Sequence, residues 1–107
     1  MASRRLQGIL RTLRQQLAGA LGDQFAGIYL YGSVARGEAT DCSDIDVLVV
    51  VRGTFDYYDL IRRTSPSVSA LSLKHGVVIS RAFVSEEQFQ AQQSPFLLNV
   101  RREGVAI

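Results

Sequence analysis

The sequence predicts an α/β (or α+β) domain in which a small sheet is covered by helices. Residues 1–107 have the length of one domain with a single core, and we expect them to form one. Segments with helical apolar spacing alternate along the chain with short β-branched runs. The run at residues 45–51 is apolar almost throughout, which is typical of a strand buried on both faces.

The composition is that of an ordinary globular protein, with 47% apolar and 21% charged residues. No apolar run approaches the roughly 20 residues that span a bilayer. Charges interrupt the first residues, which argues against a secretory signal, so we expect a cytoplasmic protein. The single Cys42 cannot form an internal disulfide, and with the single His75 it cannot complete a zinc site. We expect His75 at a helix end in a structural role.

The net charge of +2 comes from clustered arginines. We interpret the clusters as solvated helix faces, because no aromatic residues interleave with them as in a nucleic-acid site. Nucleic-acid binding through the arginine-rich first helix remains an alternative. The clustered residues are Arg4, Arg5, Arg11, Arg14, Arg62, Arg63, Arg101 and Arg102.

The first half of the chain predicts a helix, a strand and a short helix. Leucine and isoleucine recur at helical spacing over residues 4–21, after a possible N-cap at Ser3. Residues 26–31 are rich in β-formers and predict a strand. Residues 33–37 predict a short helix that Gly37 ends, and residues 38–43 predict a loop.

The second half predicts two further strands and several helices. Apolar spacing after Tyr57 predicts a long helix that ends at Gly76, and Pro66 predicts a kink or a division into two shorter helices. Residues 77–84 predict a strand. Ser85 is then a candidate N-cap, and Ser94 is another with Pro95 at the first helical position.

Two carboxylates stand at the entrance of the buried strand. Side chains alternate along a strand, so Asp44 and Asp46 should point to one side with their Cα atoms about 6.5 Å apart. An ionised Asp46 within an apolar strand is costly unless a cation or several donors satisfy it. Magnesium binds one or two carboxylates together with phosphate oxygens, so the pair predicts a metal clamp.

A glycine and a serine follow the preceding strand where the chain must turn into a helix. Gly32 permits a close backbone approach, and the Ser33 hydroxyl adds a donor to the N–H groups at the helix start. If the two strands are neighbours, this phosphate cradle faces the metal clamp. That arrangement suits phosphoryl or nucleotidyl transfer.

Three more residues complete the segment. Arg36 contacts phosphate or, as we favour, pairs with a nearby acid and fixes the loop. Ser43 is expected to cap the turn before Asp44. A purely structural interpretation remains, in which Asp44 caps a turn and Asp46 pairs with Arg36. The ordered combination favours a nucleotide site over that interpretation.

The order Gly32-Ser33-Val34-Ala35-Arg36-Gly37, a short spacer and Ser43-Asp44-Ile45-Asp46 resembles the motif of the DNA polymerase beta-type nucleotidyltransferase superfamily. The chain is most similar to its minimal single-domain members. The resemblance implies a small mixed sheet with helices mainly on one side, Mg²⁺, and a nucleoside triphosphate, usually ATP. Asp44 and Asp46 would be the catalytic metal-binding acids. The nucleotide-binding residues would be Gly32, Ser33, Arg36, Gly37 and Ser43.

One departure from the family concerns a third carboxylate, which active members carry on a later strand. The matching strand here, residues 77–84, contains no acid and offers Ser80 and Arg81 instead. Glu86 and Glu87 follow that strand, and we interpret them as acids of a helix start rather than as ligands. Another group then fills the role, or the acceptor brings its own base, or turnover is weak.

Two functions therefore compete. The first is an enzyme that moves a nucleoside monophosphate, AMP from ATP, to a hydroxyl. The second is a weakly active or inactive nucleotide-binding module that neutralises a partner. Some minimal members of the family resemble antitoxins that act with a separate helical toxin protein, in some cases by adenylylating it. A partner chain of that kind would supply the acceptor.

Overall fold

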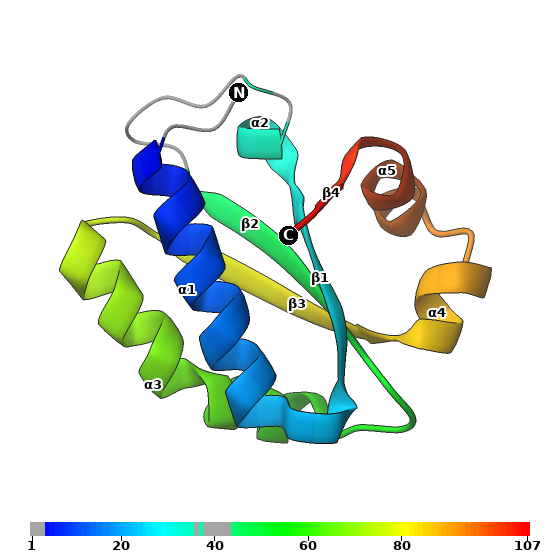
Figure 1. Ribbon diagram of the computed structural model, residues 1–107. Coiled ribbons are helices and arrows are strands. Elements are labelled where there is room, and N and C mark those ends of the chain that lie inside the picture. Colours follow the sequence, from blue (N-terminus) through cyan, green and yellow to red (C-terminus); the bar gives the residue numbers. More distant parts are fainter. Residues whose placement is uncertain (1–3, 36, 38–43) are drawn as a thin grey trace.

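A four-stranded sheet with the strand order β3-β2-β1-β4 lies at the centre of the protein (Figure 1). The computed structural model describes residues 4–35, 37 and 44–107. β1 pairs antiparallel with both β2 and β4, whereas β2 pairs parallel with β3. The sheet is therefore mixed, as the resemblance implied. The strands are β1 Phe25–Tyr31, β2 Ile45–Val51, β3 Ile79–Ser85 and β4 Val105–Ala106.

The helices agree closely with the sequence prediction. They are α1 Arg4–Leu21, the 3₁₀ turn η1 Gly22–Gln24, α2 Gly32–Ala35, α3 Tyr57–His75, α4 Glu86–Ala91 and α5 Pro95–Glu103. Ser85 caps α4 in a capping box with Gln88, and Ser94 caps α5, as predicted. Among the described residues, no helix has both the length and the hydropathy needed to cross a bilayer.

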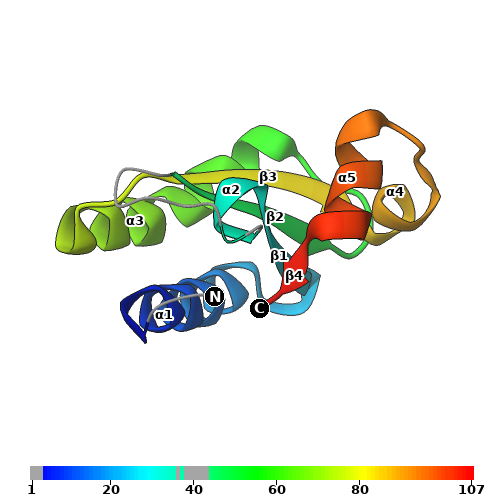
Figure 2. The same ribbon diagram turned by 90° about the horizontal axis from the view of Figure 1, so that it is seen from above.

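The main core lies between the sheet and the two long helices, α1 and α3. The apolar stripe of α1 packs here, and every second residue of β2 from Ile45 to Val51 joins it. The opposite face of β2 is covered over only part of its length, where Leu48 packs against Leu97 and Val100 of α5. Figures 1 and 2 show α4 and α5 together at one side of the molecule. Strand β2 is thus buried on both faces, as its composition predicts.

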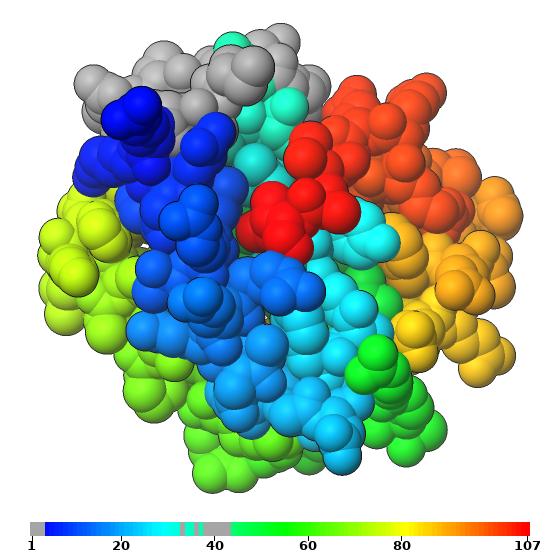
Figure 3. Space-filling model, in the orientation of Figure 1, coloured from blue at the N-terminus to red at the C-terminus, as the bar shows by residue number. Residues whose placement is uncertain are grey.

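The last residues of the chain close over the outer side of β1. The backbone N–H of Ile107 donates to the carbonyl of Ile28 at 3.1 Å, and Nε of Arg14 donates to the Ile107 carbonyl at 2.9 Å. In Figure 3 the red atoms of the C-terminal residues accordingly lie beside the blue atoms of α1.

Several arginines of the exposed clusters donate to backbone carbonyls. They therefore connect elements of the fold as well as facing solvent.

Helix α3 is continuous through Pro66, so the alternative of two shorter helices is wrong. A proline removes one backbone donor and crowds the preceding turn. Here the carbonyls of that turn receive side-chain donors. The Ile61 carbonyl accepts from the Ser65 hydroxyl at 2.7 Å and from Nη2 of Arg81 at 2.9 Å. Gly76 ends the helix in the left-handed region with φ +63°, as predicted for a C-cap.

Candidate functional site

The antiparallel pairing of β1 with β2 brings Gly32 against Asp46. Tyr31, the last residue of β1, lies opposite Asp46 in the register, and Gly32 begins α2 directly after it. A Cβ atom placed on Gly32 would lie only 2.6 Å from Oδ2 of Asp46. Gly32 also has φ +78°, a conformation that side chains disfavour. Both observations favour glycine where the carboxylate meets the turn.

The two carboxylates at the start of β2 interact electrostatically. Partial burial raises the pKa of Asp46, and the charge of Asp44 raises it further. Ile45 between them is buried in the main core, and its N–H donates to the Val78 carbonyl at 2.8 Å. The intervening side chain therefore faces the opposite side of the sheet from Asp46. A partly desolvated Asp46 carboxylate that is repelled by the Asp44 charge fits a hard divalent cation, which offsets both the desolvation and the repulsion.

Tyr31 adds a hydroxyl that the sequence analysis did not single out. Burial raises the pKa of Tyr31, and the negative charge of Asp46 and Tyr57 contribute in the same direction. Its ring meets the edge of Phe96 from α5, with 5.3 Å between the ring centroids. At neutral pH the phenol is a hydrogen-bond donor beside the acid pair. The sequence offered no local signal for Tyr31, because the residues that give it significance lie on β2 and α5.

The short helix predicted at residues 33–37 begins one residue earlier, at Gly32. α2 comprises Gly32–Ala35 and includes Ser33, and the N–H of Gly37 donates to the Val34 carbonyl at 3.2 Å. Gly37 takes φ +74°, a left-handed conformation suited to a helix stop. Arg36, Ser43 and Cys42, for which the sequence made predictions, lie outside the described residues.

Strand β3 places Ser80 at the position where a third acid was sought. Ser80 lies opposite Asp46 in the parallel register, and its neighbour Arg81 lies opposite Val47 on the other face. Nε of Arg81 donates to the Thr64 hydroxyl at 2.7 Å, so this guanidinium binds helix α3. Arg81 therefore stabilises the packing of α3 and does not reach the acid pair.

Glu86 and Glu87 belong to the first turn of α4, as the sequence indicated. They follow the far end of β3, and Ser85 at that end lies about 17 Å along the strand from Ser80.

Within the described residues no group of three or more His, Cys, Asp and Glu side chains is placed to hold a metal. The metal site predicted from the sequence rests on the acid pair, Asp44 and Asp46. His75 lies in the last turn of α3, where its carbonyl accepts from Arg5, in agreement with a helix-end position.

This geometry agrees with a family comparison. The model of the family described as "Nucleotidyltransferase domain" matches residues 10–98. The chain belongs to the nucleotidyltransferase domain family. The match includes both Gly32 and the acid pair, so the predicted motif lies within the matched region.

Relatives of this nucleotidyltransferase domain support the same family. It is 40% identical over 96 residues to a Methanocaldococcus jannaschii protein named "Putative protein adenylyltransferase MJ0604", covering 84% of this chain and 89% of the relative. A crystal structure named "putative nucleotidyltransferase" from Sulfolobus solfataricus has a TM-score of 0.61 at 18% identity, over 99% of this chain and 87% of that one. A toxin-antitoxin structure with AMP-PNP has a TM-score of 0.57 at 20% identity, over 88% of this chain and 68% of that one. The two structures show the shared fold.

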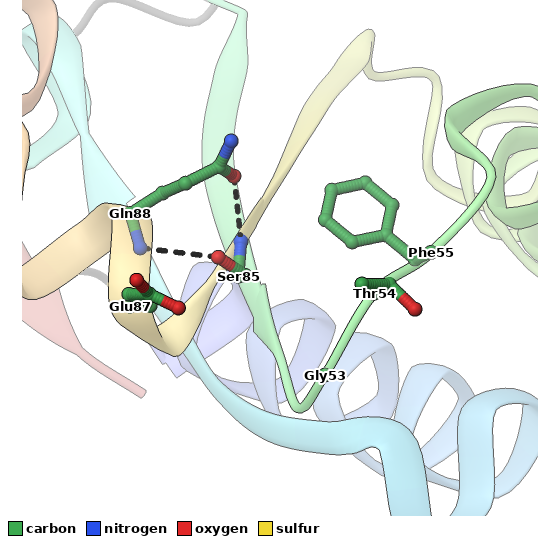
Figure 4. A pocket seen from close by; sticks show the side chains of 6 residues that line it. All are labelled: Gly53, Thr54, Phe55, Ser85, Glu87 and Gln88. Atoms are coloured by element: carbon green, nitrogen blue, oxygen red, sulfur yellow. Dashed lines mark hydrogen bonds between the residues drawn. The ribbon is translucent and has the colours of Figure 1, made fainter.

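Two cavities of the nucleotidyltransferase domain differ in their relation to the acid pair. One of about 360 Å³ lies at the far end of the sheet, where β2 and β3 both end (Figure 4). Figure 4 shows the two hydrogen bonds of the α4 capping box there. The backbone N–H of Ser85 donates to Oε1 of Gln88, and the backbone N–H of Gln88 donates to the Ser85 hydroxyl oxygen. A second cavity of about 220 Å³ includes Gly32 and Tyr31 in its wall and adjoins the acid pair.

Proposed function

We propose that this chain is a metal-dependent nucleotidyltransferase that moves a nucleoside monophosphate, AMP from ATP, to a hydroxyl on a partner protein. The observation that carries the proposal is the Asp46 carboxylate, which lies against the backbone of Gly32 and interacts electrostatically with Asp44. Family membership supports nucleotidyl transfer as the reaction class. The relative named as a putative protein adenylyltransferase favours ATP as donor and a protein as acceptor.

We propose that different residues of the chain bind the cation and the phosphates. Asp44 and Asp46 supply oxygen ligands of the kind that Mg²⁺ binds, and the missing side chain of Gly32 lets the Asp46 carboxylate approach the turn where we propose that the phosphates bind. Magnesium, when bound, neutralises phosphate charge and favours ionisation of the acceptor hydroxyl. We propose that Ser33, Arg36, Gly37 and Ser43 complete the nucleotide contacts.

In the transfer step the acceptor oxygen forms a bond to the α-phosphorus while the bond from that phosphorus to the bridging oxygen breaks. Pyrophosphate leaves with the electron pair of that bond. The acceptor loses its hydroxyl proton, for which Ser80 offers no carboxylate where a third acid was expected. Water or a base brought by the acceptor therefore takes the proton.

The test is transfer of label from α-labelled ATP in the presence of Mg²⁺, with and without the protein encoded by the adjacent gene. Asp44→Asn and Asp46→Asn should each abolish labelling, because each removes one anionic ligand with little change in shape. Glu86→Gln is the matched control, since it removes an exposed acid at the far end of β3. Labelling by either aspartate variant at the wild-type rate would refute the proposed role of the pair.

A second candidate is a nucleotide-binding module that neutralises a helical toxin-like partner with little or no turnover. Ser80 in place of a third acid favours it, and a toxin-antitoxin structure with AMP-PNP shares the fold. Capture of the adjacent gene's product by the Asp44→Asn/Asp46→Asn double variant, with no label transferred by the wild type, would favour this candidate over the enzyme.

A further inference from the structure

The cavity of about 220 Å³ beside the acid pair lies between the end of β1 and helix α5. Figure 1 shows α5 and β4 at the same end of the molecule as α2. Gly32 belongs both to the wall of this cavity and to the contact with Asp46. A ligand with phosphates at Gly32 therefore has its remaining atoms within reach of the cavity. The volume is below the roughly 300–1,000 Å³ of complete small-molecule sites, so it suits one ring system of a larger ligand.

The wall of the cavity offers aromatic faces. Phe96 and Tyr31 contact each other edge to face, and Phe96 keeps 41% of its surface exposed. Val100, which is buried, lies between α5 and the sheet as an apolar floor. Aromatic and apolar surfaces of this kind bind the flat face of a nucleobase, whichever base it is.

The polar groups of the cavity distinguish a nucleoside from a second phosphate. Glu103 lines the wall and carries a carboxylate, which accepts from sugar hydroxyls or exocyclic amines, groups that a phosphate lacks. Asn99 lines the same wall. Its Oδ1 accepts from Nη2 of Arg102 at 3.0 Å, and its amide N–H groups are donors of the kind that bind acceptors at the edge of a base. The cavity thus has the chemistry of the nucleoside end of a nucleotide.

We propose that the cavity formed by Tyr31, Phe96, Asn99 and Glu103 receives the nucleobase of the triphosphate whose phosphates bind at Gly32 and the acid pair. This inference rests on the proposed function, and it assigns α5 to substrate binding. Helix α5 then recognises the nucleoside, whereas α2 and the start of β2 recognise the phosphates and the cation.

The test compares two ligands, Mg·ATP and Mg·tripolyphosphate, by calorimetric titration of the full chain. Phe96→Ala should weaken Mg·ATP binding about tenfold, because it removes a stacking surface, and leave tripolyphosphate binding unchanged. Asn99→Ala should weaken ATP binding by a smaller factor, and this exposed helical position tolerates alanine well. Leu98→Ala is the matched control, since Leu98 lies on the same helix with 42% of its surface exposed and does not line the cavity.

The outcomes separate the inference from the proposed function. If Phe96→Ala and Asn99→Ala bind ATP as the wild type does, the nucleobase lies elsewhere and the proposed function stands. If Phe96→Ala and Asn99→Ala weaken both ligands equally, α5 supports the fold and does not bind the base. If the wild type binds neither Mg·ATP nor Mg·tripolyphosphate, the proposed function fails together with the inference.

Discussion

Gly32 and Asp46 form one structural unit, although 14 positions separate them in the sequence. The backbone at Gly32, the first residue of α2, lies so close to the Asp46 carboxylate that a Cβ added there would lie 2.6 Å from Oδ2. The closest atom is the end of a side chain, so the carboxylate would rotate away and the fold would survive. The rotated carboxylate would then no longer face the start of α2.

Gly32→Ala should therefore weaken Mg·ATP binding by more than its loss of stability explains. The left-handed backbone costs roughly 1–2 kcal/mol in any alanine variant at such a position. Gly53→Ala is the matched control, because Gly53 has φ +74° and open space around its Cα. We expect both variants to lose similar stability in urea denaturation, and Gly32→Ala alone to bind Mg·ATP at least about tenfold more weakly. Equal binding by the two variants would show that the contact with Asp46 has no role in the site.

The sequence predicted Asp44, Asp46 and Gly32 as site residues because their signals are local. A charged residue inside an apolar strand and a glycine at a strand end are both visible without knowledge of the fold. Tyr31 escaped prediction because its significance comes from Asp46 on the next strand and from Phe96 on α5. No local pattern relates those three positions.

Among the elements, α3 depends on a residue of β3. Arg81 donates to the hydroxyls of Thr64 and Ser65 and to the carbonyl of Ile61, one turn before Pro66. Burial lowers the pKa of the Arg81 guanidinium, which marks its partial desolvation, and Tyr57 offsets part of this shift. The three acceptors offset the cost of that desolvation, and they join the proline-containing turn to the sheet.

Arg81→Met should consequently cost about 2 kcal/mol of unfolding free energy, since it removes several charge-assisted hydrogen bonds in a part-buried setting. Arg62→Met on α3, the helix that Arg81 binds, is the control. Its ion pair with Asp59 is exposed, with 68% of the Arg62 side chain accessible, so a change of about 0.5 kcal/mol or less is expected. Urea denaturation measures both, and Mg·ATP binding should persist in both. A loss of binding in Arg81→Met at unchanged stability would place Arg81 in the site instead.

Element boundaries followed from the sequence where capping residues mark them. Ser85, Ser94 and Gly76 are such cases, and the structure confirms each. The strand predicted at residues 77–84 forms at Ile79–Ser85. The prediction began two residues too early because Val77 and Val78 are apolar but lie outside the pairing with β2. The position of Arg81 on β3 could not reveal its partners, since they lie on a helix that crosses the sheet.

At the scale of the whole molecule, the two faces of the sheet differ in how they are covered. The face under α1 and α3 holds the main core, and the face toward α5 carries Asp46 and Tyr31 at its open end. The sequence predicted the order of the elements and the central burial of β2. It did not predict β4, because two residues carry no periodic signal, nor the order of the strands, which depends on pairing between distant segments.

The central claim is that the acid pair beside Gly32 holds a nucleotide through a divalent cation. Calorimetric titration of ATP into the wild type and the Asp44→Asn/Asp46→Asn double variant, in Mg²⁺ or in excess chelator, tests it most directly. We expect the wild type to bind ATP in Mg²⁺ only, and the double variant to bind at least about a hundredfold more weakly. Equal affinity of the wild type without the cation, or wild-type affinity in the double variant, would contradict it.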